Sequence, residues 1–244
     1  MKKSIYLLII TIFTIVCVIV GTNIHMGGHL GISRMDDDVE EYENSATLEA
    51  FDSISVDADV MELQIVRGEE FGIQYDCTED MIPQYKVEKE KLVIQQKKKK
   101  NELFGTHRCS VVVTIPSEIS LKNIDVETDV GDVELNQITV DRLDGQSDVG
   151  DVKLENVTAK ELYWENDTGN IELAACSFDE LDISTDVGDI EIESDQDLED
   201  YEFHLETNVG EVKLQGEDYG RKCITKGSAG SVTAKSDVGD VIVK

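Results

Sequence analysis

The chain has 244 residues, 40% of them hydrophobic, and its 52 Asp and Glu against 22 Lys and Arg give a net charge of −30. This composition supports one sizeable folded core and excludes a largely disordered chain. The negative charge argues against binding to nucleic acid, because phosphate groups would be repelled, and an anionic membrane surface would repel the chain too.

The first 23 residues predict a signal anchor. The chain begins with the basic sequence MKK, and an uncharged run follows from Ile5 to Val20. No Ala-x-Ala site follows the run, and no small residue directly precedes Cys17, so we favour an uncleaved transmembrane anchor over residues 1–23 and keep a cleaved signal as the alternative. The lysines would hold the N-terminus in the cytoplasm. The expected location is therefore the cell membrane, with a single pass and an extracytoplasmic C-terminal domain.

Residues 24–48 combine several glycines with a run of Asp and Glu, which predicts an acidic flexible stalk. The β pattern begins at Phe51, and no sustained amphipathic helical pattern follows it, so the fold class is all-β. Residues 49–120 form less regular strands, expected to close one end of the domain. The lysine run 97–100 predicts a solvated corner loop, with a basic finger that contacts an acidic neighbour, a lipid headgroup or a wall polymer as the alternative.

The second half of the chain repeats one short motif six times. The copies read TDVGDVEL, SDVGDVKL, NDTGNIEL, TDVGDIEI, TNVGEVKL and SDVGDVIV. The first four corner glycines, Gly131, Gly150, Gly169 and Gly188, follow one another at steps of 19 residues. A fixed period is typical of a solenoid, and Gly beside Asp suits a corner between two strands. We therefore predict that residues 121–244 form regular rungs, which stack as parallel strands in a β-helix, or β-solenoid.

Stacked rungs predict ladders of equivalent residues. Alternation points Val126 and Val130 inward, with a phase change at the corner Gly-Asp pair. An inward column of small polar residues should hydrogen-bond along the axis: Thr128, Ser147, Asn166, Thr185, Thr207 and Ser236. Trp164 follows Gly145 one rung below, so Trp164 is predicted to fill the space that this glycine leaves.

Acidic residues flank the corner glycines in two columns. The columns are Asp129, Asp148, Asp167, Asp186 and Asp237 before the glycine, and Asp132, Asp151, Asp189 and Asp240 after it. Carboxylates about 5 Å apart repel one another, so either each one caps corner amides or a cation such as calcium bridges them. Asn170, Asn208 and Glu211 interrupt the columns, which favours capping. We assign no catalytic, cofactor or metal residue, and calcium stays an alternative.

The remaining chemistry is sparse. The four cysteines outside the anchor are compatible with two disulfides or with free buried thiols, and the sequence does not give their pairing: Cys77, Cys109, Cys176 and Cys223. There is no Cys-x-x-Cys pair for zinc. Aromatic residues total 6%, and no motif suggests a nucleophile with its base, so we expect a protein that is not an enzyme.

The chain resembles the bacterial "putative adhesin" family, a domain of unknown function made of β-strand repeats. The likeness is carried by FDSISV at 51–56, LVI at 92–94 with its lysine loop, VTIP at 113–116 and the serial S/T-D-V-G-D-V-x-L units. It covers about residues 49–244. The resemblance implies a right-handed β-solenoid, often exported or membrane-tethered in bacterial envelopes and sometimes linked with envelope-stress systems. It supplies no catalytic residues.

The expected function is that of a non-catalytic, membrane-tethered module for cell-surface adhesion or binding, or of an envelope scaffold or stress sensor. Its partner would be a cell-envelope component or another surface partner. The alternatives are a calcium-stabilised surface module and a carbohydrate-active enzyme on a β-helix. Because the sequence stops within a strand pattern at Val241–Lys244, we also expect an open strand edge there, with a risk of end-to-end self-association, unless the longer excursion between Leu214 and Val232 covers it.

Overall fold

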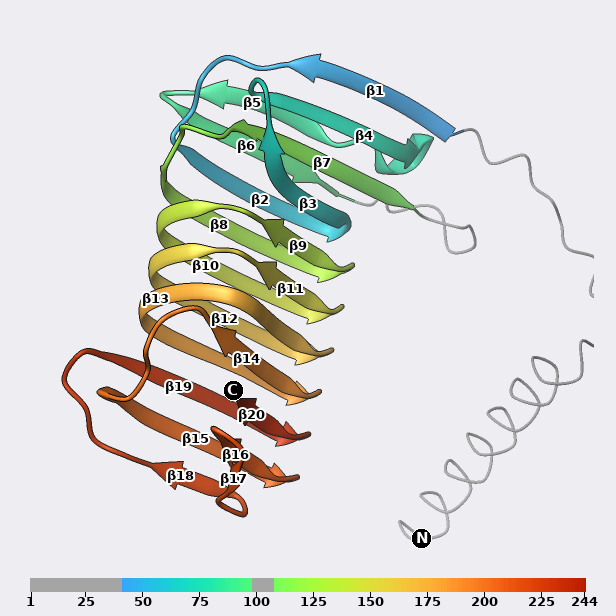
Figure 1. The fold of residues 1–244 in the computed structure, drawn as a ribbon. Coiled ribbons are helices and arrows are strands. Elements are labelled where there is room, and N and C mark those ends of the chain that lie inside the picture. The colour runs from blue at the N-terminus through green and yellow to red at the C-terminus, as the bar shows by residue number, and fades with distance from the viewer. Residues whose placement is uncertain (1–40, 98–107) are drawn as a thin grey trace, which may run out of the picture. The chain divides into compact units, whose positions relative to one another are not determined.

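The computed structural model describes residues 41–97 and 108–244, and these residues form an all-β domain (Figure 1). The one exception to strand structure is a short 3-10 helix, η1 (Glu79–Met81). No helix among the described residues is long and apolar enough to span a membrane. The predicted anchor 1–23, the stalk residues 24–40 and Lys98–Lys100 lie outside the described residues.

Two sheets make up the domain, and both are parallel in their interior. In spatial order, sheet B contains β5 (Gln84–Glu88), β6 (Lys91–Gln96), β2 (Ser53–Val60), β8 (Leu121–Val130), β10 (Thr139–Val149), β12 (Thr158–Thr168), the second part of β13 (Ile171–Val187), β19 (Gly230–Val238), β15 (Tyr201–Val209) and β18 (Lys222–Ile224). Its first and last strand pairs are antiparallel.

Sheet A has the same plan. In spatial order it contains β1 (Glu41–Thr47), β4 (Gly72–Thr78), β7 (Cys109–Pro116), β3 (Glu62–Gly68), β9 (Val133–Asn136), β11 (Val152–Glu155), the first part of β13, β14 (Ile190–Ser194), β20 (Val241–Val243), β16 (Val212–Leu214) and β17 (Glu217–Asp218). Antiparallel pairs close both of its ends. The parallel stack therefore ends in antiparallel strands on both sides, so its regular rungs are not left as open edges.

Each regular rung consists of a long strand in sheet B, a Val-Gly-Asp corner and a short strand in sheet A. Alternate side chains of both strands point into the space between the sheets, so Ile124, Val126, Val133 and Leu135 are all buried. Equivalent residues of neighbouring copies pair directly, as Thr128 does with Ser147. The repeat therefore builds one continuous, solenoid-like core, as the sequence predicts.

Trp164 lies fully inside this core, as predicted. It pairs with Gly145 of the neighbouring rung. A Cβ added to Gly145 would lie 2.1 Å from Cε3 of Trp164, so the indole ring occupies the space of the missing side chain. The predicted large-against-small packing is confirmed.

The rungs do not stack in the order of the sequence. The C-terminal rung, β19 and β20, lies between the rung of β13 and β14 and the rung of β15 and β16 (Figure 1). The expectation of an open edge at Val241–Lys244 is wrong, because β20 pairs with β14 on one side and β16 on the other. The longer segment after β16 permits this order, since it forms the capping strands β17 and β18 before the chain returns.

The start of the domain also differs from the prediction. Residues 41–47 form β1, which pairs antiparallel with β4 from Glu41 opposite Thr78 to Thr47 opposite Gly72. The last part of the predicted stalk is therefore an ordered edge strand. Its acidic and polar residues are compatible with a strand that covers another at the rim of a sheet.

Candidate functional site

The corner of the solenoid brings neighbouring rungs so close that only glycine fits. Gly131 has a φ of 136°, which side-chain-bearing residues rarely adopt. A Cβ on Gly150 would lie 2.1 Å from the carbonyl oxygen of Gly131. The repeated glycine thus has two physical causes, its backbone conformation and the contact with the rung below.

The residue after each corner glycine caps the next rung, and we name these residues the capping column. Asp132 accepts a hydrogen bond from the amide of Asp151 at 2.8 Å, and Asp151 accepts one from the amide of Asn170 at 2.7 Å. The same contact continues from Asn170 to Asp189, from Asp189 to Asp240 and from Asp240 to Glu211, at 2.7–2.9 Å. The capping role predicted for this column is confirmed, and Asn170 performs it with its amide oxygen.

The inward column of small polar residues is buried as predicted, but most of its members hydrogen-bond differently from the prediction. Thr185, Ser236 and Thr207 each donate to the carbonyl of the corner glycine in the neighbouring rung, at 2.7–3.1 Å. Only Ser147 donates to another member, Asn166, at 3.0 Å. These side chains therefore tie the corner backbone of one rung to the next.

A row of valines lies exposed immediately before the corner glycines, and we name it the valine edge. Its members are Val130, Val149, Val187, Val238 and Val209, each 44–58% exposed, with Thr168 in the third rung. Strand pairing places the six residues side by side in the order Val130, Val149, Thr168, Val187, Val238 and Val209.

The inward placement predicted for Val130 is wrong, because the strand turns at the corner and exposes two successive residues, Asp129 and Val130. At adjacent-strand spacing the edge is roughly 24 Å long.

Acidic residues border the valine edge on both sides. On one side lies the capping column. On the other lies what we name the outer acidic column, which is exposed: Asp129, Asp148, Asp167, Asp186, Asp237 and Asn208. Asn208 donates to Asp237 at 2.7 Å. The result is an apolar strip within a strongly negative surface.

Neither column forms a recognisable metal centre within the described residues, where no group of three or more His, Cys, Asp or Glu side chains is placed to hold a metal ion. In the capping column, one oxygen of each of Asp132, Asp151, Asp189 and Asp240 already accepts a backbone amide. Hydrogen bonding therefore accounts for these carboxylates without a cation.

The outer face of sheet B contains a shallow depression of about 320 Å³. Tyr163 lines it, and the guanidinium of Arg142 lies 4.4 Å above the ring. Arg142 also pairs with Asp144 at 2.7 Å and with Glu161 at 2.6 Å. The depression suits a small polar ligand, but its one guanidinium is already held by two carboxylates and the ring.

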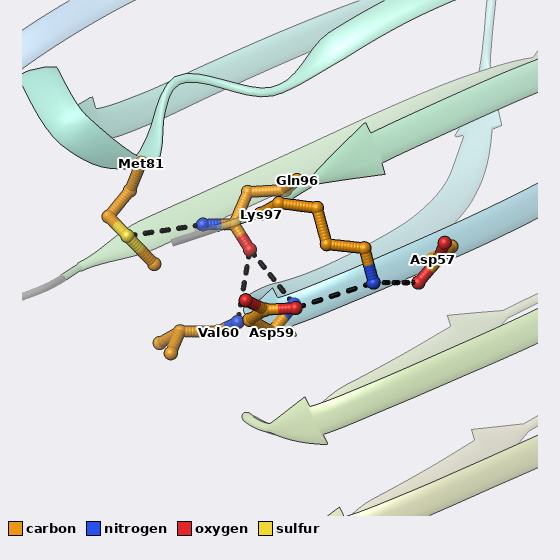
Figure 2. Close-up of polar contacts among 6 residues, drawn as sticks. All are labelled: Asp57, Asp59, Val60, Met81, Gln96 and Lys97. Carbon is orange, nitrogen blue, oxygen red and sulfur yellow. Dashed lines mark hydrogen bonds and ion pairs between the residues drawn. The ribbon is translucent and has the colours of Figure 1, made fainter. Parts of the chain in front are cut away.

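One residue of the lysine run 97–100, Lys97, is described, and it follows β6 directly. Lys97 contacts Asp57 at 2.5 Å and Asp59 at 3.3 Å, and the hydrogen bond to Asp57 raises the pKa of Lys97 (Figure 2). Beside it, buried Gln96 accepts hydrogen bonds from the amides of Asp59 and Val60 at 3.1 and 3.0 Å. Gln96 thus caps a corner that lacks the Val-Gly-Asp motif. The sequence did not predict this capping role, because Gln96 lies outside the repeats.

The geometry defines an all-β, solenoid-like domain with antiparallel caps. The chain belongs to the Toastrack DUF4097 family, whose model matches residues 51–244. The predicted resemblance to an adhesin-like domain of unknown function is confirmed.

A solved structure shares this fold. The chain is similar to a "putative cell adhesion protein" from Clostridium sporogenes, at 15% identity and a TM-score of 0.53, over 84% of this chain and 99% of that one. It is also similar to a "putative adhesin" from Bacteroides fragilis, at 18% identity and a TM-score of 0.47, over 84% and 97% of the two chains. At 15% identity, the similarity to the Clostridium sporogenes protein shows the fold alone. No curated protein matches the sequence.

Proposed function

We propose that this protein is a non-catalytic binding module of the bacterial cell envelope, for adhesion, scaffolding or stress sensing. The predicted N-terminal anchor would tether it outside the cytoplasm, and its rungs would wind in a right-handed sense. The single observation that carries the proposal is the valine edge. The adhesin names of the structural neighbours agree with a surface role.

The valine edge consists of two groups of adjacent exposed valines, with Thr168 between them. Val130 and Val149 pair directly, as do Val187 and Val238. Scattered exposed valines are ordinary on a protein surface, whereas adjacent ones in a row favour a binding surface. Its width of one residue fits a narrow partner element, such as one face of a helix or strand.

The charges around the strip define the chemistry of that partner. Acidic residues lie on both sides of the valines, and the chain carries a net charge of −30. A second copy of the same edge would bring like charges together, and an anionic lipid surface would be repelled. We therefore assign the edge to a protein partner with an apolar stripe bordered by Lys or Arg.

The test uses the full chain and a defined probe, a fluorescent amphipathic peptide of Leu and Lys with a matched Leu and Glu peptide as control. We expect the Leu-Lys peptide to bind and the Leu-Glu peptide not to bind. Changing all five valines of the edge to Thr keeps every charge and repeats the residue found at Thr168. This variant should lose at least tenfold in affinity.

The salt dependence separates the two contributions. Wild type and the Thr variant should show the same decrease of affinity with ionic strength, because their charges are equal. Equal affinity of the two proteins for the Leu-Lys peptide would refute a role for the valines and leave only nonspecific attraction to an acidic surface. A second control, Val152→Thr, lies in the core and should affect stability without a selective effect on binding.

A further inference from the structure

Two of the four described cysteines lie directly opposite each other. Cys77 of β4 is the strand partner of Cys109 of β7 in an antiparallel pair. The next pair along, Thr78 and Arg108, is hydrogen-bonded, with the amide of Thr78 donating to the carbonyl of Arg108 at 2.9 Å. Hydrogen-bonded and non-hydrogen-bonded pairs alternate along an antiparallel ladder, so Cys77 and Cys109 occupy the non-hydrogen-bonded type, in which side chains lie closest.

Both side chains also point to the same side. Cys77 and Cys109 are 1% and 2% exposed, and each belongs to the core. Opposed Cα atoms of such a pair lie within the separation that a disulfide spans. Both residues are free thiols in this structure.

The other described cysteines have different neighbours. Cys176 is the strand partner of Ser194 and donates from its thiol to the carbonyl of Leu154 at 3.2 Å. Cys223 is the strand partner of Leu205. These two residues act as buried apolar side chains, and the pairing that the sequence left open has one geometric solution among the described residues.

We propose that Cys77 and Cys109 are the site of a disulfide, which fastens β4 to β7 at the capped end of sheet A. The segment between the two residues contains η1, β5 and β6, so the bond would tie both caps of this end together. This proposal rests on the backbone geometry and does not require the binding function of the valine edge. An extracytoplasmic location would supply the oxidising conditions in the cell.

The chemistry is an exchange with a disulfide donor, such as oxidised glutathione or an oxidised dithiol protein. The thiolate of Cys77 attacks one donor sulfur, a mixed disulfide forms, and one donor thiolate leaves. The Cys109 thiolate then attacks the Cys77 sulfur and releases the second donor thiolate. The two cysteine protons pass to the donor, which gains two electrons.

Burial sets the condition for this reaction. Neither sulfur can meet a donor while β4 is closed on β7, so the bond should form during folding or while this end is transiently open. The test therefore unfolds the full chain in denaturant with reductant, refolds it with a reduced and oxidised glutathione mixture, and blocks remaining thiols with N-ethylmaleimide in denaturant. Non-reducing peptide mass spectrometry then reads the linkage.

We expect one linked peptide pair, Cys77 with Cys109, and alkylated Cys17, Cys176 and Cys223. In Cys77→Ser the thiol of Cys109 should become alkylated, whereas Cys176→Ser should leave the linkage intact. Reduction should lower the melting temperature of wild type by several degrees and should not affect Cys77→Ser/Cys109→Ser. Full alkylation of both residues after refolding, or a link from Cys77 to a different cysteine, would overturn the proposal. The wild-type linkage map decides the outcome even if a serine variant does not fold.

Discussion

The capping column makes a quantitative prediction at Asp151. Its carboxylate accepts the amide of Asn170 at 2.7 Å, so Asp151→Ala removes an acceptor from an exposed corner amide. Loss of such a side-chain cap costs about 1 kcal/mol. Asp151→Asn keeps an oxygen in the same place, as native Asn170 shows by accepting the amide of Asp189 at 2.9 Å.

The same substitution also removes a negative charge from the column. Asp132 is the charged neighbour of Asp151 within the column, because Asn170 on the other side is neutral. Two unit charges one strand spacing apart repel by about 0.9 kcal/mol in water, and salt reduces this further. Asp151→Asn should therefore change the free energy of unfolding by less than about 0.5 kcal/mol, and in the stabilising direction.

Urea unfolding of the full chain at low and high salt measures both effects, with calcium and with a chelator in parallel. At high salt the Ala variant should lose about 1 kcal/mol and the Asn variant should match wild type. At low salt both variants should be more stable relative to wild type than at high salt by the same small amount, less than about 0.5 kcal/mol, because both lack the charge of Asp151. The reasoning fails if Ala and Asn destabilise equally and calcium raises the melting temperature of wild type alone. That result would make this column a calcium site.

Two further predictions concern the core. Gly145→Ala should destabilise by about 1–3 kcal/mol, because its Cβ would overlap the Trp164 ring, and Trp164→Leu should recover part of that loss in a double-mutant cycle measured by urea unfolding. Gln96→Leu should cost about 2–4 kcal/mol, since it leaves the amides of Asp59 and Val60 without their acceptor, and an unchanged melting temperature would show that water replaces the side chain.

The sequence predicts the rungs well because their signals are local and periodic. The Gly-Asp corner and the alternation around it set both the strand boundaries and the pairing of Thr128 with Ser147. The Trp164 and Gly145 contact is predictable for the same reason, since a fixed period aligns residues that are distant in sequence. Asp132 and its equivalents could also be assigned to capping from their position beside the glycine.

The order of the last rungs is not predictable in this way. Equal motifs pair equally well with any neighbour of the same kind, so local pattern alone cannot choose between β15 and β19 as the partner of β13. The choice depends on the antiparallel caps β17 and β18, which form before the chain returns. Cys77 and Cys109 pose the same difficulty, because their register depends on a strand pairing across the segment that contains β5 and β6.

The backbone conformation alone does not explain why valine recurs at the valine edge. A strand end before a glycine corner favours β-branched residues, and Thr168 shows that a polar one fits this position. An acidic protein that only needed solubility would place Thr or a charged residue in every rung, since an exposed strip of valine invites association. The fold requires the glycines and the caps beside them, but it does not require Val130 or Val187 to be apolar. The recurrence of valine at a site where the backbone accepts a hydroxyl is therefore best explained by contact with a partner.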